Sequence, residues 1–138
     1  MINLMVGKKG SGKTKKLVDF ANNLISQSTG NVVVIEKGLK LTYDLDYKAR
    51  LIDIDNYSIS DFCGLYGFLC GICAGNYDVT DILVDSTLKI AGEDLNKFIP
   101  FIDKLNSVFE KSKTNLILSI SVDENELPNE LKNLVNIL

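Results

Sequence analysis

Apolar residues along this chain form two kinds of run: short continuous ones and longer ones at helical spacing. The short runs are rich in β-branched residues and are typical of strands buried in a sheet. They are Ile2–Val6, Asn31–Glu36, residues 50–55, residues 81–85 and residues 114–122. Because longer amphipathic stretches separate them, the pattern predicts an α/β fold, a three-layer α/β/α sandwich around a mostly parallel sheet of about five strands.

The longer stretches predict the helices. Apolar residues recur every three or four positions in a first helix over residues 17–28. Ser60 or Asp61 is expected to cap a second helix. A third helix covers residues 92–111, where Pro100 is expected to kink it or to start a second segment.

Two further segments are less regular. Residues 38–48 alternate between polar and aromatic side chains, which predicts a loop or a small hairpin. Pro128 fits the first turn of a short terminal helix. That helix is expected to bury Leu131, Leu134 and Val135.

One motif carries a chemical prediction. Residues 7–14 read Gly-Lys-Lys-Gly-Ser-Gly-Lys-Thr and fill the pattern G-x-x-x-x-G-K-[ST] without a mismatch. The motif follows a strand and opens a helix, where backbone N–H groups and the positive end of the helix dipole cradle a phosphate chain. Lys13 is expected to reach the β- and γ-phosphates, and the Thr14 hydroxyl to hold Mg²⁺. The predicted nucleotide-binding residues are Gly7, Lys8, Lys9, Gly10, Ser11, Gly12, Lys13, Thr14 and Lys15.

This motif and the run Ile82, Leu83, Val84, Asp85 resemble the Walker A and Walker B motifs of the P-loop NTPase superfamily. The resemblance implies that ATP is the ligand and Mg²⁺ the cofactor. It also implies that Thr14 and Asp85 are the metal ligands and that Lys13 is the catalytic lysine. Ser86 stands where many hydrolytic members carry a glutamate. The base of a hydrolytic reaction is therefore expected elsewhere in the chain.

Glu36 is the candidate for that base. It ends the strand after the first helix, and members similar to RecA and the rotary ATPases carry their water-orienting glutamate at the end of that neighbouring strand. The alternative is a solvated glutamate at a strand end. At the end of the fifth strand, Ser119 or Ser121 is expected to sense the γ-phosphate, as polar residues do in many relatives. Asp53 and Asp55 are interpreted as solvated acids or as ligands of a second substrate, water or metal.

Composition narrows the choice of function. The net charge is −3 and the pI about 4.9, which disfavours nucleic acid or an anionic membrane as the main partner. Histidine is absent, and three cysteines in one apolar stretch are interpreted as reduced, buried thiols of a cytoplasmic protein. No apolar run reaches the ~18 residues of a membrane span, and no signal peptide is predicted. Residues 1–138 are interpreted as a single nucleotide-binding domain.

Three functions stay open at this point. Arg50 is the only arginine, which disfavours a kinase with an arginine-rich lid, and the missing N-K-x-D motif disfavours a GTPase. What remains is a slow or partner-activated ATPase, a nucleotide sensor, or a small phosphotransferase. A homo-oligomer or protein partner is compatible with these, with Arg50, Lys37 or Lys89 acting across an interface. The Walker A motif is also similar to that of small bacterial proteins labelled twitching-motility ATPases. That group's histidine motif and interfacial arginines are missing, so its motility role is not carried over.

Overall fold

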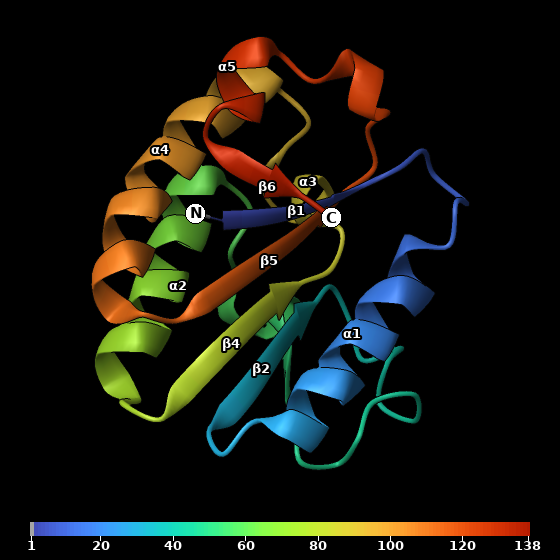
Figure 1. The fold of residues 1–138 in the computed structure, drawn as a ribbon, viewed down its shortest axis with the longest axis vertical. Helices are drawn as coiled ribbons and strands as arrows, with labels where there is room; N and C mark the ends of the chain where they lie inside the picture. The colour runs from blue at the N-terminus through green and yellow to red at the C-terminus, as the bar shows by residue number, and fades with distance from the viewer. Residues whose placement is uncertain (1) are drawn as a thin grey trace.

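Residues 2–138, which the computed structural model describes, form one six-stranded sheet with helices on both faces (Figure 1). The strands are β1 (Ile2–Val6), β2 (Asn31–Glu36), β3 (Arg50–Asp53), β4 (Val79–Val84), β5 (Asn115–Ile120) and β6 (Val135–Ile137). The helices are α1 (Lys13–Gln27), α2 (Phe62–Gly75), α3 (Thr87–Ala91), α4 (Leu95–Ser112) and α5 (Asn129–Lys132), with 3₁₀ turns at Ile54–Tyr57 and Glu124–Glu126. The predicted α/β fold with a parallel sheet is confirmed.

The strand order is β3-β2-β4-β5-β1-β6, and every neighbouring pair within residues 2–138 is parallel. One strand, β5, therefore lies between β1, which leads into the glycine-rich motif, and β4, which leads to Asp85. On the other side of β4 lies β2, which ends at Glu36. The parallel arrangement brings the carboxyl ends of these four strands to one edge, where ligands bind in such sheets.

Two apolar clusters hold the layers together, one on each face of the sheet. Successive residues of β1 point to opposite faces, so Met5 packs with α1 while Leu4 packs with α2, α3 and α4. Figure 1 shows α1 on one side of the sheet and α2 with α4 on the other. Residues 37–49, here called the cover loop, lie on the α1 face, where Leu41 and Leu45 are buried. The cover loop is built of turns, so the loop alternative for this segment is confirmed.

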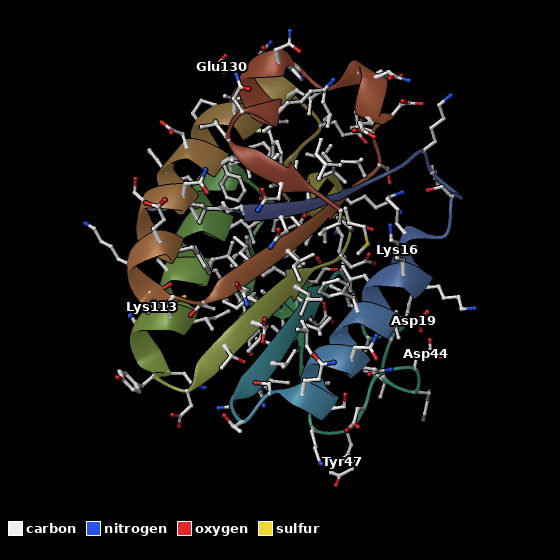
Figure 2. The ribbon with its side chains drawn as sticks, viewed as in Figure 1. Lys16, Asp19, Asp44, Tyr47, Lys113 and Glu130 are labelled. Carbon is white, nitrogen blue, oxygen red and sulfur yellow. The ribbon has the colours of Figure 1, made fainter. Side chains whose placement is uncertain are left out.

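The cover loop is tied to α1 through one side chain. The Asn22 amide donates from Nδ2 to the Asp44 carbonyl at 3.0 Å, and its Oδ1 accepts from the Asp46 N–H at 2.8 Å. Figure 2 shows Asp44 beside α1 and Tyr47 at the outer end of the loop. This clamp fixes the outer half of the cover loop against the helix that follows the glycine-rich motif.

Three predicted elements need correction. The expected strand over residues 50–55 ends at Asp53, because the Asp53 side chain accepts from the Asp55 N–H at 3.0 Å and starts a 3₁₀ turn. The terminal helix is only four residues long. Val135 instead begins β6, which pairs with the free edge of β1 and makes the sheet six-stranded rather than five-stranded.

The predicted helix over residues 92–111 corresponds to α4, which begins only at Leu95, and the short helix α3 before it was not predicted. Gly92, at φ +119°, ends α3, and the Asp94 side chain caps α4 by accepting from the Asn96 N–H at 2.9 Å. Pro100 lies inside α4 and does not start a new segment. The proline leaves the Asn96 carbonyl without its helical N–H partner, and both residues are exposed, so water can satisfy that carbonyl. None of the helices in residues 2–138 has the length and apolar character needed to cross a bilayer.

Candidate functional site

The glycine-rich motif forms the turn between β1 and α1. Gly10 and Gly12 have φ values of +84° and +88°, in the left-handed region that side chains disfavour, which explains glycine at these two positions. Gly12 is the N-cap of α1, and its carbonyl accepts from the Lys16 N–H at 3.1 Å. The base of the turn is fixed because the Gly7 N–H donates to the Val122 carbonyl at 3.0 Å.

Helix α1 begins without a capping side chain. Gly12 provides none, and the first turn of the helix contains no acidic residue. The N–H groups of that turn are therefore available to an anion, and the helix dipole favours one there. They adjoin an open cavity of about 340 Å³. Its lining residues are Lys9, Gly10, Gly12, Lys13, Thr14, Asp85, Ser86, Lys89 and Ser121.

Lys13 is half-buried in this turn. Its Nζ donates to the Lys8 carbonyl at 3.1 Å, so the side chain folds back over the glycine-rich turn. Burial lowers the pKa of Lys13, the charge of Asp85 raises it, and the charge of Lys89 lowers it again. The ammonium group is thus held over the turn within electrostatic reach of both Asp85 and Lys89.

Thr14 and Asp85 come together from opposite sides of the cavity. The Thr14 hydroxyl lies 3.4 Å from both carboxylate oxygens of Asp85, which is 9% exposed. A hydroxyl and a carboxylate are oxygen ligands of the kind Mg²⁺ prefers, and Mg²⁺ usually takes only one or two protein ligands beside phosphates and waters. The donor set fits the predicted cofactor. No cluster of three or more histidine, cysteine, aspartate or glutamate side chains suited to a metal occurs in the described part of the chain.

The two serines of the fifth strand have different positions. Ser119 is buried in β5 between the two motif strands; its hydroxyl donates to Asp85 Oδ1 at 3.1 Å and accepts from the Ser86 N–H at 2.8 Å. Ser121 is exposed and lines the cavity. Ser119 therefore orients Asp85, whereas Ser121 is the serine that lines the cavity.

Glu36 lies on the other side of Asp85. The Asp85 N–H donates to the Ile35 carbonyl at 2.9 Å, so the strand ends of β2 and β4 are adjacent. Glu36 is only 3% exposed, and its Oε2 accepts from the Leu41 N–H of the cover loop at 2.8 Å. Burial raises the pKa of Glu36 and the charge of Asp85 raises it further, while the N–H groups of Leu41 and Lys40 oppose the rise. The alternative of a solvated glutamate is therefore wrong: this carboxyl group is beside the site but covered.

Among the other residues considered in the sequence analysis, two acids and three cysteines lie outside the cavity. Asp53 accepts from the Gly38 N–H at 2.9 Å, and Asp55 pairs with Lys37 at 3.0 Å. Both acids thus hold the base of the cover loop. The cysteines on α2 are not buried as predicted: Cys63 is exposed and the other two are half-buried, because Leu65 and Leu69 form the buried face of that helix.

Sequence reasoning did not find two contributors to the site. Lys89 of α3 lines the cavity of its own chain, whereas the sequence suggested a role across an interface. Asn22 appeared only as a polar residue on α1, and its clamp on the cover loop depends on a contact across more than twenty residues of sequence. No local pattern signals either position.

The fold and this strand–turn–helix site define a P-loop NTPase-type α/β architecture. No family model matches the sequence, and no curated protein does. Among solved structures the chain is similar to PCH-2 of C. elegans, with a TM-score of 0.58 at 10% identity. It is also similar to domain III of the Thermotoga maritima replication initiation protein DnaA, with a TM-score of 0.51 at 16% identity.

The alignments cover 99% and 98% of this chain. They cover only 34% of the PCH-2 chain and 53% of the DnaA chain, so this chain spans about a third and about half of the structures it matches. At these identities the likeness concerns the fold.

Proposed function

We propose that this protein binds ATP with Mg²⁺ and hydrolyses it slowly or when a partner activates it. The observation that carries the proposal is the convergence of the glycine-rich turn, Lys13, Thr14 and Asp85 around one cavity at the carboxyl edge of the sheet. An uncapped helix start with an excess of lysine over acid in the cavity lining suits a polyanion.

Each residue of the site has a role in this proposal. The N–H groups of the turn and of α1 bind the phosphate chain, and Lys13 exchanges the Lys8 carbonyl for phosphate oxygens. Thr14 and Asp85 would hold Mg²⁺, which when bound neutralises charge on the β- and γ-phosphates. Glu36 orients a water and accepts its proton, which its place beside Asp85 allows.

The covered state of Glu36 supports slow turnover. Its Oε2 is occupied by the Leu41 N–H, and the side chain is almost fully buried. A base must come within hydrogen-bond reach of the water it deprotonates. Hydrolysis therefore requires the cover loop to move, and a protein partner or a second copy that displaces the loop would accelerate it.

The same observation favours one alternative, a nucleotide sensor that binds ATP without turning it over. In that function the cover loop would stay closed. A phosphotransferase has no comparable support, because Asp53 and Asp55 are engaged at the base of the cover loop.

Nucleotide-dependent melting tests the binding part of the proposal. ATP with Mg²⁺ at 100 times its dissociation constant adds about 2.7 kcal/mol of stability. For 138 residues, with an unfolding entropy of about 2.1 cal/mol/K per residue, this corresponds to a rise in Tm of about 9 °C. Lys13→Ala should abolish the rise, while Lys16→Ala, on the same turn of α1, should keep most of it. An equal ATP-induced rise in the Lys13→Ala variant would refute the site.

Steady-state ATP hydrolysis tests the catalytic part. Glu36→Gln should keep the ATP-induced rise in Tm and lose turnover, because glutamine accepts the Leu41 hydrogen bond but no proton from water. Turnover that persists in this variant would remove Glu36 from the role of base. A wild-type protein that binds ATP with no turnover at any protein concentration would favour the sensor.

A further inference from the structure

Lys89 is the one exposed residue of helix α3. Its neighbours Thr87, Leu88, Ile90 and Ala91 are all buried against the core on the α2–α4 face. The backbone is fixed as well, because the Lys89 N–H donates to the Ser86 carbonyl at 3.0 Å. A short, firmly anchored helix therefore presents a single lysine at a defined place, four residues after Asp85.

Two adjoining cavities meet at this lysine. One is the cavity of about 340 Å³ described above, here called the phosphate cavity. It shares four lining residues with a second cavity of about 380 Å³: Lys9, Ser86, Lys89 and Ser121. Lys15 is not among the lining residues of these two cavities and lines a third one beside the cover loop. Lys89 thus lies where the two cavities adjoin, together with Ser86 and Ser121, which follow the carboxyl ends of β4 and β5.

The charges around the phosphate cavity are unbalanced. Lys9, Lys13 and Lys89 line it, and Asp85 is the only acid among its lining residues. The ion pairs found in residues 2–138, Lys8 with Asp123 and Lys37 with Asp55, do not involve Lys89. Lysine side chains that face the same cavity repel one another, and an anion bound there offsets this repulsion.

The position along the phosphate chain follows from the motif. In a P-loop the lysine reaches the β- and γ-phosphates and the metal-binding carboxylate lies at the same end of the chain. Lys89 lines the same cavity as that carboxylate, Asp85, and follows it by four residues along the chain. The terminal phosphate is therefore the group nearest to its ammonium.

We propose that Lys89 binds the γ-phosphate from within the same chain and so distinguishes ATP from ADP. This inference rests on the proposed function and deepens it. It also explains how a chain with one arginine supplies a cation at the end of the phosphate chain. Arg50, by contrast, lies in β3 at the far edge of the sheet and is not among the lining residues of the phosphate cavity.

The test compares two ligands on matched variants. Dissociation constants for a non-hydrolysable ATP analogue and for ADP, both with Mg²⁺, are measured by calorimetry on wild type, Lys89→Ala, Lys89→Arg and Lys16→Ala. Lys16 has the same charge, is exposed on α1 (Figure 2) and is not among the lining residues of either cavity. It reports the general loss of one positive charge. Because Lys89 is exposed, its replacement by alanine should leave the fold intact.

Lys89→Ala should weaken binding of the ATP analogue about tenfold and leave ADP binding nearly unchanged, as expected for one charge-assisted hydrogen bond. Lys89→Arg should restore most of the preference, and Lys16→Ala should keep it. An unchanged ratio of the two constants in Lys89→Ala would overturn the inference while leaving the proposed function intact. A wild-type protein that binds neither nucleotide would overturn both.

Discussion

Replacing Asn22 measures what the cover loop contributes to stability and to turnover. Asn22→Ala removes two hydrogen bonds, one to the Asp44 carbonyl and one from the Asp46 N–H. Because water can replace each of these exposed bonds, we expect a loss of about 1–2 kcal/mol for the pair. Alanine recovers about 0.5 kcal/mol through its higher helix propensity. The net loss is then about 0.5–1.5 kcal/mol, or about 2–5 °C in Tm for a chain of 138 residues.

The matched control is Asn23→Ala. Asn23 is the next residue on α1 and is exposed, so its replacement brings the same gain in helix propensity. We expect that variant to melt about 2 °C above wild type, and the two variants to differ by about 3–7 °C. Thermal melting followed by circular dichroism is sufficient. Equal melting temperatures for the two variants would show that the clamp contributes nothing.

The same pair of variants tests whether the loop restrains catalysis. Loosening the clamp should free the segment that donates to Glu36 and increase the rate of ATP hydrolysis in Asn22→Ala but not in Asn23→Ala. The rate is measured at saturating ATP, so that a change in affinity does not affect it. A lower or unchanged rate in Asn22→Ala, with the expected loss of stability, would refute the view that the cover loop limits turnover.

Two further variants probe the groups on either side of Asp85. The pKa of Glu36 is raised in the folded protein. Its contribution to the free energy of unfolding is therefore present at acidic pH and is lost as the pH rises through that pKa. Glu36→Gln should for this reason be more stable than wild type at pH 7–8. The advantage should shrink toward the ordinary pKa of glutamate, and a difference in Tm that stays constant from pH 4 to 8 would contradict this. Ser119→Ala should lower the free energy of unfolding by about 1–3 kcal/mol, since it leaves the Ser86 N–H without its partner. It should also weaken Mg²⁺-dependent ATP binding, because Asp85 loses a hydrogen-bond donor. Mg²⁺ dependence of ATP binding that is the same in Ser119→Ala as in wild type would argue against a positioning role for Ser119.

The phosphate-binding turn was predictable because its physics is local. Eight consecutive residues specify the left-handed glycines, the helix start and the lysine, and the distant hydrogen bond from the Gly7 N–H to the Val122 carbonyl only anchors the base of the turn. The meeting of Thr14 with Asp85 required the order of the strands, which short apolar runs do not encode. The sequence therefore named candidate residues that the fold brings to one cavity, but it did not show that Ser119 supports Asp85 from β5.

Two elements that the sequence did not predict have other causes. Strand β6 is three residues long and exists because β1 offers a free edge, so its own sequence carries little signal. Helix α3 has only five residues, too few to show a helical period, and the backbone turn at Gly92 and the Asp94 cap separate it from α4. Tertiary pairing in the first case and local backbone geometry in the second outweighed the periodicity.

In the proposed function, the arrangement around Asp85 separates nucleotide binding from turnover. Lys89 and Ser121 line the phosphate cavity on the β5 side, while Glu36 stands on the β2 side beneath the cover loop. The side with Lys89 is open to an anion, and the side with Glu36 is closed by the cover loop. An event that moves the cover loop therefore changes hydrolysis without rebuilding the phosphate cradle, and a change at Lys89 alters the preference for ATP without exposing the base. If the two sides act independently, the double variant should lose as much ATP affinity as Lys89→Ala alone and gain as much turnover as Asn22→Ala alone, because the two sites share no contact.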